Sequence, residues 1–447
     1  MAELHADVLI LGAGLGGLSV AYHLQQQGIS DFLVVEKGSL GGICGTKDVN
    51  GFLLDFGPHL FFTKDAYVVS LMERLLKGNL RTGRSDPWQY AYGAYGKYPY
   101  TTNMRYFPRE IRERCLKDFH AAVKKKERDK EAGTAPKLAT YPDWCRYHYG
   151  KGFADLFMLR YAKKYWTTDP SELNTEWIGD KIHLPTLEEV ELGAAAEGGK
   201  HYYYDQFRYP ERGGAEQLTK AFYDALPHQK VLPSCGVKRV DLQKKKVRLE
   251  DGREICFRML INTIALPLFV KLIDGVPKNV LDAAAKLRAT SVACFLVGVD
   301  AEDISDKAWI YFHEDELSFF RLSFPQHFSP HTCPPGCSSV WAEVAYKGKL
   351  DAEGMSKKVV ADLKALGILK KEKVIATGFV DARLAYPIYD KERAPSLKVI
   401  KEFLSGKGVE LAGRFGKWEY WWTHQVILDS KKVAEKVAGR VPGNAPA

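Results

Sequence analysis

Several apolar segments of the sequence predict an α/β protein with a parallel sheet. An apolar run at 7–11 is typical of a buried parallel strand. A helix-like stretch at 18–27 follows it, and Phe32–Val35 then supplies a second apolar strand. Segments suited to further strands of the same sheet occur at 237–263, where 254–257 and 259–263 are expected to form two short strands, and at Val409–Gly413. Since these segments are far apart in the chain, the sheet must be assembled from separate parts of it.

A glycine-rich turn joins the first strand to the first helix. Gly12 permits a tight turn, Gly14 lets a pyrophosphate approach the backbone, and Gly17 lets the helix pack closely on the sheet. The helix N-terminus supplies positive charge to a phosphate, and Glu36, at the end of the second strand, can accept hydrogen bonds from a ribose. A lone motif of this kind is weak evidence, but its strand–turn–helix context predicts a dinucleotide site.

A second glycine pair favours FAD over NAD as the dinucleotide. Lys37 follows the ribose acid, and Gly41 and Gly42 come shortly after it. This arrangement resembles the extended motif of the glutathione-reductase-like FAD proteins. The segment 51–62, which contains His59, resembles the one that passes under the flavin in amine-oxidase-type flavoproteins. We therefore predict a glutathione-reductase-like (Rossmann) domain that binds FAD.

The chain is too long to fold around one ordinary hydrophobic core, and its patterns of apolar and polar residues predict three domains. The FAD-binding domain is expected to be discontinuous and to consist of residues 1–65, 206–270 and 396–447. Residues 66–205 carry helix-like stretches and predict a helical domain, in which the charged stretch at 124–137 is expected to be a solvated loop. Residues 271–395 alternate aromatic and polar positions, which predicts an antiparallel sheet that forms the substrate domain. Val237, which opens a strand of the returning FAD domain, is predicted to contact the cofactor.

Composition narrows the class of protein. Its 447 residues are 46% hydrophobic and 27% charged, as in a soluble globular protein, and the net charge is +9. The basic residues are scattered, and no nucleic-acid-binding motif is present, so small anionic molecules are more plausible partners than nucleic acid. Eight cysteines without a CxxC pair indicate free thiols, a cytoplasmic location and no metal site. No apolar run reaches transmembrane length, so no integral membrane segment is expected.

Later motifs resemble those of one family, the UDP-galactopyranose mutases, which belong to the amine-oxidase/protoporphyrinogen-oxidase superfamily. The resemblance covers almost the whole chain, in order, and includes the eukaryotic branch of the family. Its motifs are Tyr161–Trp166, Phe207–Gly214, Trp309–Asp315, Phe319–Arg321, Trp341–Val344, Tyr386–Asp390 and Gly413–Tyr420. Each motif alone is modestly specific, and together they are strong.

The resemblance implies a flavin that does chemistry without net oxidation. In such mutases reduced FAD attacks a sugar through N5, and the flavin N5–sugar adduct allows the ring to reclose in a contracted, furanose form. Arg321, His59 and Tyr386 are implied to be catalytic, Gly413 and Arg414 to bind the cofactor, and NAD(P)H or another reductant to supply electrons. The implied substrate-binding residues are Trp166, Lys181, Tyr204, Tyr311, Tyr420 and Trp421. Arg321 is expected to act on charge in the cleft and not on folding.

Several positions depart from the family pattern on the substrate side. Lys181 stands where the eukaryotic mutases have arginine, Tyr204 stands where they have asparagine, and Trp421 and Trp422 replace a tyrosine and an aspartate of the prokaryotic mutases. The nucleotide sugar is therefore not necessarily UDP-galactose. Two alternatives stay open: an FAD-dependent oxidoreductase of the amine-oxidase/protoporphyrinogen-oxidase type, and a flavin-binding protein that has lost catalysis.

Overall fold

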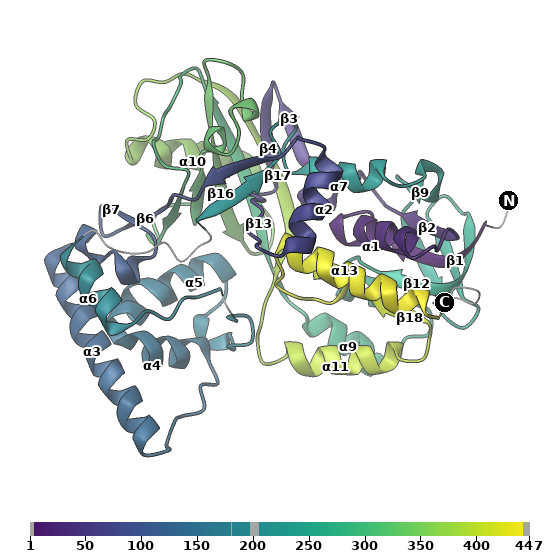
Figure 1. Ribbon diagram of the computed structural model, residues 1–447, viewed down its shortest axis with the longest axis horizontal. Coiled ribbons are helices and arrows are strands. Elements are labelled where there is room, and N and C mark those ends of the chain that lie inside the picture. Colours follow the sequence, from purple (N-terminus) through teal and green to yellow (C-terminus); the bar gives the residue numbers. More distant parts are fainter. Residues whose placement is uncertain (1–3, 180, 197–204, 441–447) are drawn as a thin grey trace.

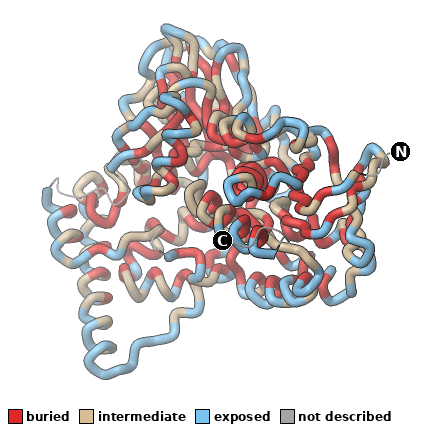
Figure 2. Tube along the Cα trace, turned by 45° about the vertical axis from the view of Figure 1, so that its right-hand side comes forward, coloured by how far each residue is buried: buried red, intermediate tan, exposed pale blue. Residues whose placement is uncertain are grey.

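The structure is a computed structural model that describes residues 4–179, 181–196 and 205–440. It has a mixed α/β fold with two large sheets and a group of helices beside them (Figure 1). Buried residues concentrate in the sheets and in the helices that pack on them, whereas the outer loops are exposed (Figure 2). No helix within these ranges is both long enough and apolar enough to cross a membrane.

The first sheet has the strand order β10-β11-β12-β1-β2-β9, and β18 lies beside the end of β12. Its strands are β1 (Leu4–Leu11), β2 (Phe32–Val35), β9 (Val231–Leu232), β10 (Val237–Asp241), β11 (Lys246–Leu249), β12 (Glu254–Asn262) and β18 (Val409–Leu411). Strand β1 pairs in parallel with β2 and β12, as the buried apolar runs predicted. The two short strands expected between 254 and 263 form the single strand β12.

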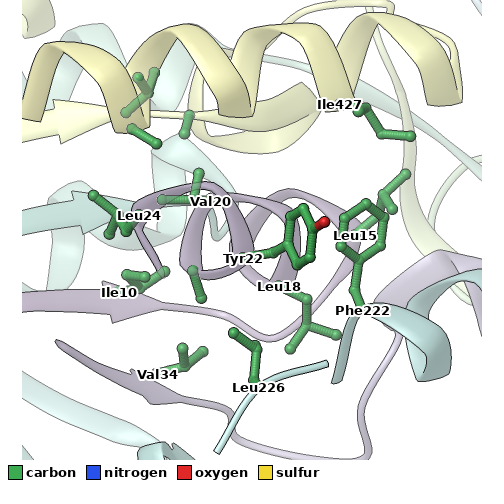
Figure 3. Packing of buried hydrophobic residues seen from close by; sticks show 14 of the residues in the cluster. Ile10, Leu15, Leu18, Val20, Tyr22, Leu24, Val34, Phe222, Leu226 and Ile427 are labelled. Atoms are coloured by element: carbon green, nitrogen blue, oxygen red, sulfur yellow. The ribbon is translucent and has the colours of Figure 1, made fainter. Parts of the chain in front are cut away.

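Helices cover both faces of this sheet. On one face, α1 (Leu15–Gln26) packs against α2 (Ala66–Leu76), α7 (Glu216–Asp224) and α13 (Thr423–Ala438). Figure 3 shows this core, in which Ile10 and Val34 from the sheet lie beneath helical residues such as Leu24 and Ile427. On the other face lie α8 (Leu266–Leu272), α9 (Lys278–Lys286) and α11 (Arg393–Leu404). The core thus draws on segments from both ends of the chain.

The second sheet has the strand order β17-β13-β16-β15-β14-β6-β7. Its strands are β6 (Pro87–Ala91), β7 (Ala94–Lys97), β13 (Ala289–Val299), β14 (Trp309–Phe312), β15 (Arg321–Ser323), β16 (Ser338–Tyr346) and β17 (Val374–Pro387). Every neighbouring pair is antiparallel except β14 with β6. Helix α10 (Ala352–Ala365) packs on this sheet. Two antiparallel pairs lie outside both sheets: the hairpin of β3 (Thr46–Val49) with β4 (Phe52–Asp55), and β5 (Arg81–Arg84) with β8 (Gln206–Tyr209), which are far apart in the chain.

The longer helices that remain are α3 (Arg109–Glu131), α4 (Tyr141–Phe153) and, after a π-helical turn at Ala154–Met158, α5 (Leu159–Trp166) and α6 (Leu187–Ala195). The short helix α12 (Gly413–Gly416) follows β18. The prediction of a loop at 124–137 is wrong for the first half of that stretch, because α3 continues to Glu131. Lysine, arginine and glutamate are good helix formers, and the Lys125–Asp129 ion pair of 2.7 Å, one helical turn apart, supports the extension. The three-part division of the chain stays a prediction, but β6 and β7 join the second sheet and α2 packs on the first.

Candidate functional site

A cavity of about 470 Å³ is lined by residues from both sheets and from the helices beside them. Most of the residues that the sequence singled out line this one cavity. They are Gly12, Gly14, Glu36, Gly41, Gly42, His59, Trp166, Lys181, Tyr311, Arg321, Tyr386, Gly413, Arg414, Tyr420 and Trp421. Gly17, Lys37 and Val237 do not line it, and Tyr204 lies outside the described residues.

The glycine-rich turn forms one end of the cavity. The amide of Gly12 donates to the carbonyl of Val35 (2.8 Å), and its φ of +96° is a conformation that glycine tolerates best. Gly17 acts through packing, because a Cβ atom there would lie 1.8 Å from the carbonyl oxygen of Gly12. Gly14 caps the N-terminus of α1 and forms a β-bridge with Gly41, so two glycine segments meet at this end.

Glu36 is held in place by backbone amides. Its Oε2 accepts a hydrogen bond from the amide of Ala13 (2.8 Å) and its Oε1 accepts one from Gly38 (2.9 Å). Lys37 points elsewhere and forms an exposed ion pair of 3.0 Å with Glu250. Val237 pairs with Leu249 in the sheet. The structure thus brings Glu36 to the cavity but leaves Lys37 and Val237 away from it.

This end of the cavity fits a dinucleotide. A Cβ atom at Gly14 would meet its nearest atoms only at 3.8 Å, on Gly41 and Gly42, so a side chain there would fill the space between the two glycine segments. The N-terminus of α1, where Leu15 and Gly16 also line the cavity, has no capping side chain. An uncapped helix N-terminus beside such a space suits the phosphates of FAD.

At the other end, Arg321 and Glu343 form a buried ion pair. Strands β15 and β16 place them opposite each other, and the guanidinium donates from Nε to Oε2 and from Nη2 to Oε1 (2.8 Å). The Glu343 side chain is 1% exposed and that of Arg321 is 20% exposed. Burial works to lower the pKa of Arg321, but Glu343 raises it well above its ordinary value, so the guanidinium stays charged. Gly57 closely approaches the pair, since a Cβ atom there would lie 2.7 Å from Glu343 Oε1.

His59 is a neutral base beside this pair. Its Nδ1 lies 2.9 Å from the carbonyl oxygen of Gly57, which can only accept, so Nδ1 carries the ring proton and Nε2 does not. Burial, together with the nearby charges of Arg414 and Arg321, lowers the pKa of His59 to about 4 despite the opposing effect of the Gly57 hydrogen bond. Near neutral pH the ring therefore offers an acceptor and no positive charge.

Tyrosines form one wall of the cavity. The hydroxyls of Tyr165 and Tyr420 lie 2.6 Å apart, and the ring of Tyr165 stacks on that of Tyr386 at 4.6 Å. Burial raises the pKa of all three phenols, so they remain protonated hydrogen-bond donors. Tyr161, one turn before Tyr165 in α5, lies edge-on to Tyr311 at 5.8 Å.

Two further cations border the same wall. The guanidinium of Arg414, in α12 (Gly413–Gly416), lies 5.4 Å from the ring centroid of Tyr386 and 5.3 Å from that of Tyr420. Its Nη atoms donate to the carbonyls of Ala385 and Trp421, while its buried Nε has no hydrogen-bond partner among the described residues. Lys181 Nζ lies 5.6 Å from the ring centroid of Tyr420. Trp166 packs edge-on to the same ring at 5.3 Å.

Glu343, Tyr161 and Tyr165 are among the cavity residues that were not predicted as site residues. Glu343 could have been found, because it is a single acid in the otherwise apolar segment 340–344 and therefore needs a buried partner. Tyr161 and Tyr165 have the i, i+4 spacing that puts both on one face of a helix. That spacing marks a shared face, but nothing in it says whether the face meets a cavity or the core.

Comparisons with known proteins agree with this geometry. The model of the family of flavin containing amine oxidoreductases matches residues 15–421. A 76-residue segment, 16% of this chain, is 33% identical to the UDP-galactopyranose mutase of Mycoplasma pneumoniae and spans only 19% of that relative. The fold is similar to that of reduced UDP-galactopyranose mutase, with a TM-score of 0.89, 22% identity and 98% and 97% of the two chains covered. It is also similar to putrescine oxidase bound to putrescine, with a TM-score of 0.66, 15% identity and 98% and 99% covered. The chain belongs to the family of flavin-containing amine oxidoreductases and is an FAD-dependent enzyme.

Proposed function

We propose that this protein is a mutase that interconverts the pyranose and furanose rings of a nucleotide sugar. The observation that carries the proposal is the set of donors gathered at one end of the cavity. Arg321, Arg414 and Lys181 are cationic there, and the hydroxyls of Tyr165, Tyr386 and Tyr420 are protonated donors. Guanidinium groups and hydroxyls of this kind suit the oxygens of a diphosphate.

The charge of this end argues against an amine as substrate. An ammonium group would meet three cations, whereas the nearby carboxylate, Glu343, is buried and already paired with Arg321. Like charges in a cavity of low dielectric repel strongly. An anionic substrate would meet the reverse situation, because among the described residues at this end the three cations outnumber the one acid. Membership of a family named after amine oxidation therefore does not decide the substrate.

The glycine segments would hold FAD, with the diphosphate at the N-terminus of α1 and a ribose at Glu36. Gly57, His59 and Gly413 would border its flavin ring. When bound and reduced, the flavin would supply a nucleophilic nitrogen, N5, in this cavity. The reductant would be NAD(P)H or another donor.

The side chains of the cavity have separate tasks in such a reaction. Arg321 and the hydroxyls of Tyr386 and Tyr420 would stabilise the negative charge of the departing nucleoside diphosphate. His59, with its proton held on Nδ1, would accept a hydrogen bond at Nε2 from a sugar hydroxyl or from the cofactor. The aromatic walls would exclude water, so that the sugar recloses its ring instead of being hydrolysed.

The sugar itself stays open in this proposal. Lys181 lies against the wall where the eukaryotic mutases carry an arginine, and Trp421 and Trp422 both line the cavity. Bulky rings reduce the room for a hexose and favour a smaller sugar or a different nucleotide. Tyr204, the other departure, lies outside the described residues.

One observation favours a second candidate, an FAD-dependent oxidoreductase of the amine-oxidase/protoporphyrinogen-oxidase type. Glu343 neutralises Arg321 through both carboxylate oxygens, which reduces the attraction of that guanidinium for a phosphate. The rings of Tyr98, Tyr100, Tyr161 and Trp177 also line the cavity and would suit an uncharged planar substrate.

An anaerobic assay separates the two candidates. The FAD-loaded protein, reduced with dithionite, is incubated with UDP-galactopyranose and with other nucleotide pyranoses such as UDP-arabinopyranose, and products are resolved by chromatography. A mutase forms the furanose isomer over many turnovers without consuming reductant stoichiometrically. An organic substrate that reduces the flavin and yields peroxide in air, with no conversion of any nucleotide sugar, would establish the oxidoreductase instead.

A further inference from the structure

The loop that carries Tyr420 and Trp421 into the cavity has a costly backbone conformation. Trp418 has a φ of +59°, in the left-handed region that a bulky side chain seldom adopts. Its indole is fully buried in the core beside the first sheet. Such a conformation persists only where the surrounding structure holds it, so the groups that contact this loop bear on the position of Tyr420.

Arg393, at the start of α11, holds the carbonyl of Trp418. Its Nε and Nη2 donate to that oxygen at 3.1 and 2.7 Å, and Nη2 also lies 2.6 Å from Glu419 Oε2. The arginine side chain is only 5% exposed, and it does not line the cavity. A guanidinium can make these contacts together because its donors lie in one rigid plane.

Tyr389 connects the same arginine to Tyr420. The Arg393 guanidinium stacks on the Tyr389 ring at 3.7 Å. The Tyr389 hydroxyl donates to Glu419 Oε2 (2.5 Å) and accepts a hydrogen bond from the amide of Tyr420 (2.9 Å). The backbone next to the cavity tyrosine is thus fixed by a hydroxyl that, like Arg393, lies outside the cavity.

A third segment joins this assembly from the part of the chain that carries Trp177 and Lys181. Arg393 Nη1 lies 3.5 Å from Glu176 Oε2, and the amide of Asn174 donates to the carbonyl of Tyr389 (2.8 Å). Trp177, the residue after Glu176, contacts the ring of Tyr420 edge-on at 6.4 Å. Arg393 therefore lies where three segments of the cavity wall meet.

We propose that Arg393 and Tyr389 are positioning residues, which hold the loop 418–420 so that Tyr420 keeps its place at the reacting end of the cavity. The inference rests on the proposed active site but holds for either reaction there, because it concerns the position of the wall and not the identity of the substrate. Neither residue touches the cavity, and both act through the backbone of Trp418 and Tyr420.

The test uses the FAD-loaded protein and the variants Arg393→Met, Arg393→Lys and Tyr389→Phe. Arg288→Ala is the matched control, since Arg288 bridges Asp390 and Glu172 (2.7 and 2.8 Å) in two of the same segments, and these ion pairs do not involve the loop 418–420. Hydrogen–deuterium exchange of the peptide 418–422 is measured together with flavin content, melting temperature, kcat and KM. Turnover is measured with whichever of the two reactions, isomerisation of a nucleotide sugar or oxidation of an organic substrate, the wild-type protein catalyses.

We expect Tyr389→Phe and Arg393→Met to speed exchange at 418–422 and to lower kcat about tenfold or more, with flavin content retained. Arg393→Lys should recover part of both effects, and Arg288→Ala should change neither. Equal exchange in wild type and both loop variants overturns the inference. So does a kcat loss that Arg288→Ala reproduces, since the role would then be general stability. If no nucleotide sugar is converted, the proposed function fails, but the exchange measurement still decides the positioning role.

Discussion

Glu343 accepts two hydrogen bonds from the guanidinium of Arg321, directly across the pairing of β15 with β16. Both charges are largely removed from water, and each is the chief compensation for the other. Arg321, which the sequence led us to expect to act in the reaction and not in folding, therefore also contributes to the stability of the fold. Its replacement removes a charge from the cavity and leaves a buried carboxylate unpaired.

Arg321→Ala should therefore lose stability as well as turnover, which revises the expectation drawn from the sequence. Removing one partner of a buried ion pair costs about 3–5 kcal/mol. Urea unfolding of the FAD-loaded protein should show a loss of this size. A variant with wild-type stability would mean that Glu343 is solvated or protonated in solution.

The double variant Arg321→Met/Glu343→Leu provides the control. Replacing both charges with apolar groups of similar volume leaves no unpaired charge, so stability should recover most of the loss. Turnover should stay low, because the cavity lacks its guanidinium. Recovery of turnover in the double variant would show that Arg321 has no part in the reaction.

Two glycines of the first turn should respond differently to alanine. Gly17→Ala places a Cβ atom 1.8 Å from the carbonyl oxygen of Gly12, so α1 must shift and the protein should be destabilised or insoluble. Gly14 has an ordinary φ of −75°, and a Cβ atom there meets nothing closer than 3.8 Å. Gly14→Ala should fold normally but occupy the space of the cofactor.

Flavin titration and thermal melting check this contrast. For Gly14→Ala we expect FAD affinity to fall by about tenfold or more, about 1.4 kcal/mol, while the apoprotein melts as wild type does. If Gly14→Ala retained wild-type affinity for FAD, the dinucleotide would not pass between the two glycine segments.

The local geometry of the glycine-rich end of the cavity could be predicted from the sequence better than the pairing of side chains at the Arg321 end, for a physical reason. Gly12, Gly14 and Glu36 act through local backbone geometry, which a strand–turn–helix pattern specifies within a short stretch. The pairing of Arg321 with Glu343 depends on the register of two strands, and register is set by the whole sheet. A buried acid in an apolar strand signals that a partner exists without saying which residue it is.

Element limits failed where tertiary context outweighed local signals. Helix α3 extends through charged residues that predict solvent exposure, because exposure and helicity are compatible. Strand β12 runs without interruption through a segment expected to form two strands, since β1 pairs along most of its length. The tyrosine pair of α5 could be placed on one helical face but not assigned to a cavity.

Asp55 should make stability depend on pH. Burial raises its pKa to about 6, although hydrogen bonds from Thr46, Tyr209 and the amide of Ala215 oppose the shift. An unfolded aspartate titrates near pH 3.9, so between about pH 4 and 6 the folded state binds more protons than the unfolded state. The contribution of Asp55 to stability therefore falls as pH rises through this window, by at most about 3 kcal/mol.

Comparison with Asp55→Asn isolates this effect. The amide cannot ionise, yet it keeps an acceptor for Thr46 or Ala215 and offers a donor to the Tyr209 hydroxyl. The unfolding free energy of wild type minus that of the variant should decrease between pH 4 and pH 7. A difference that is constant with pH would show that Asp55 keeps an ordinary pKa.

Lys181 offers a prediction about the substrate end that does not require turnover. Its ammonium lies 5.6 Å from the Tyr420 ring centroid, where the eukaryotic mutases place an arginine. If a nucleoside diphosphate binds here, Lys181→Ala should weaken UDP binding to the FAD-loaded protein about tenfold, and added salt should reduce the difference. Lys181→Arg should bind UDP more tightly than wild type, because forked donors match phosphate oxygens.

The exposed Lys163, on α5 but outside the cavity, provides the control, since Lys163→Ala removes the same charge from the surface. Calorimetric titration measures all four proteins. Equal UDP affinity in wild type, Lys181→Ala and Lys181→Arg would place the diphosphate elsewhere, and no UDP binding to wild type would count against the nucleotide-sugar proposal itself.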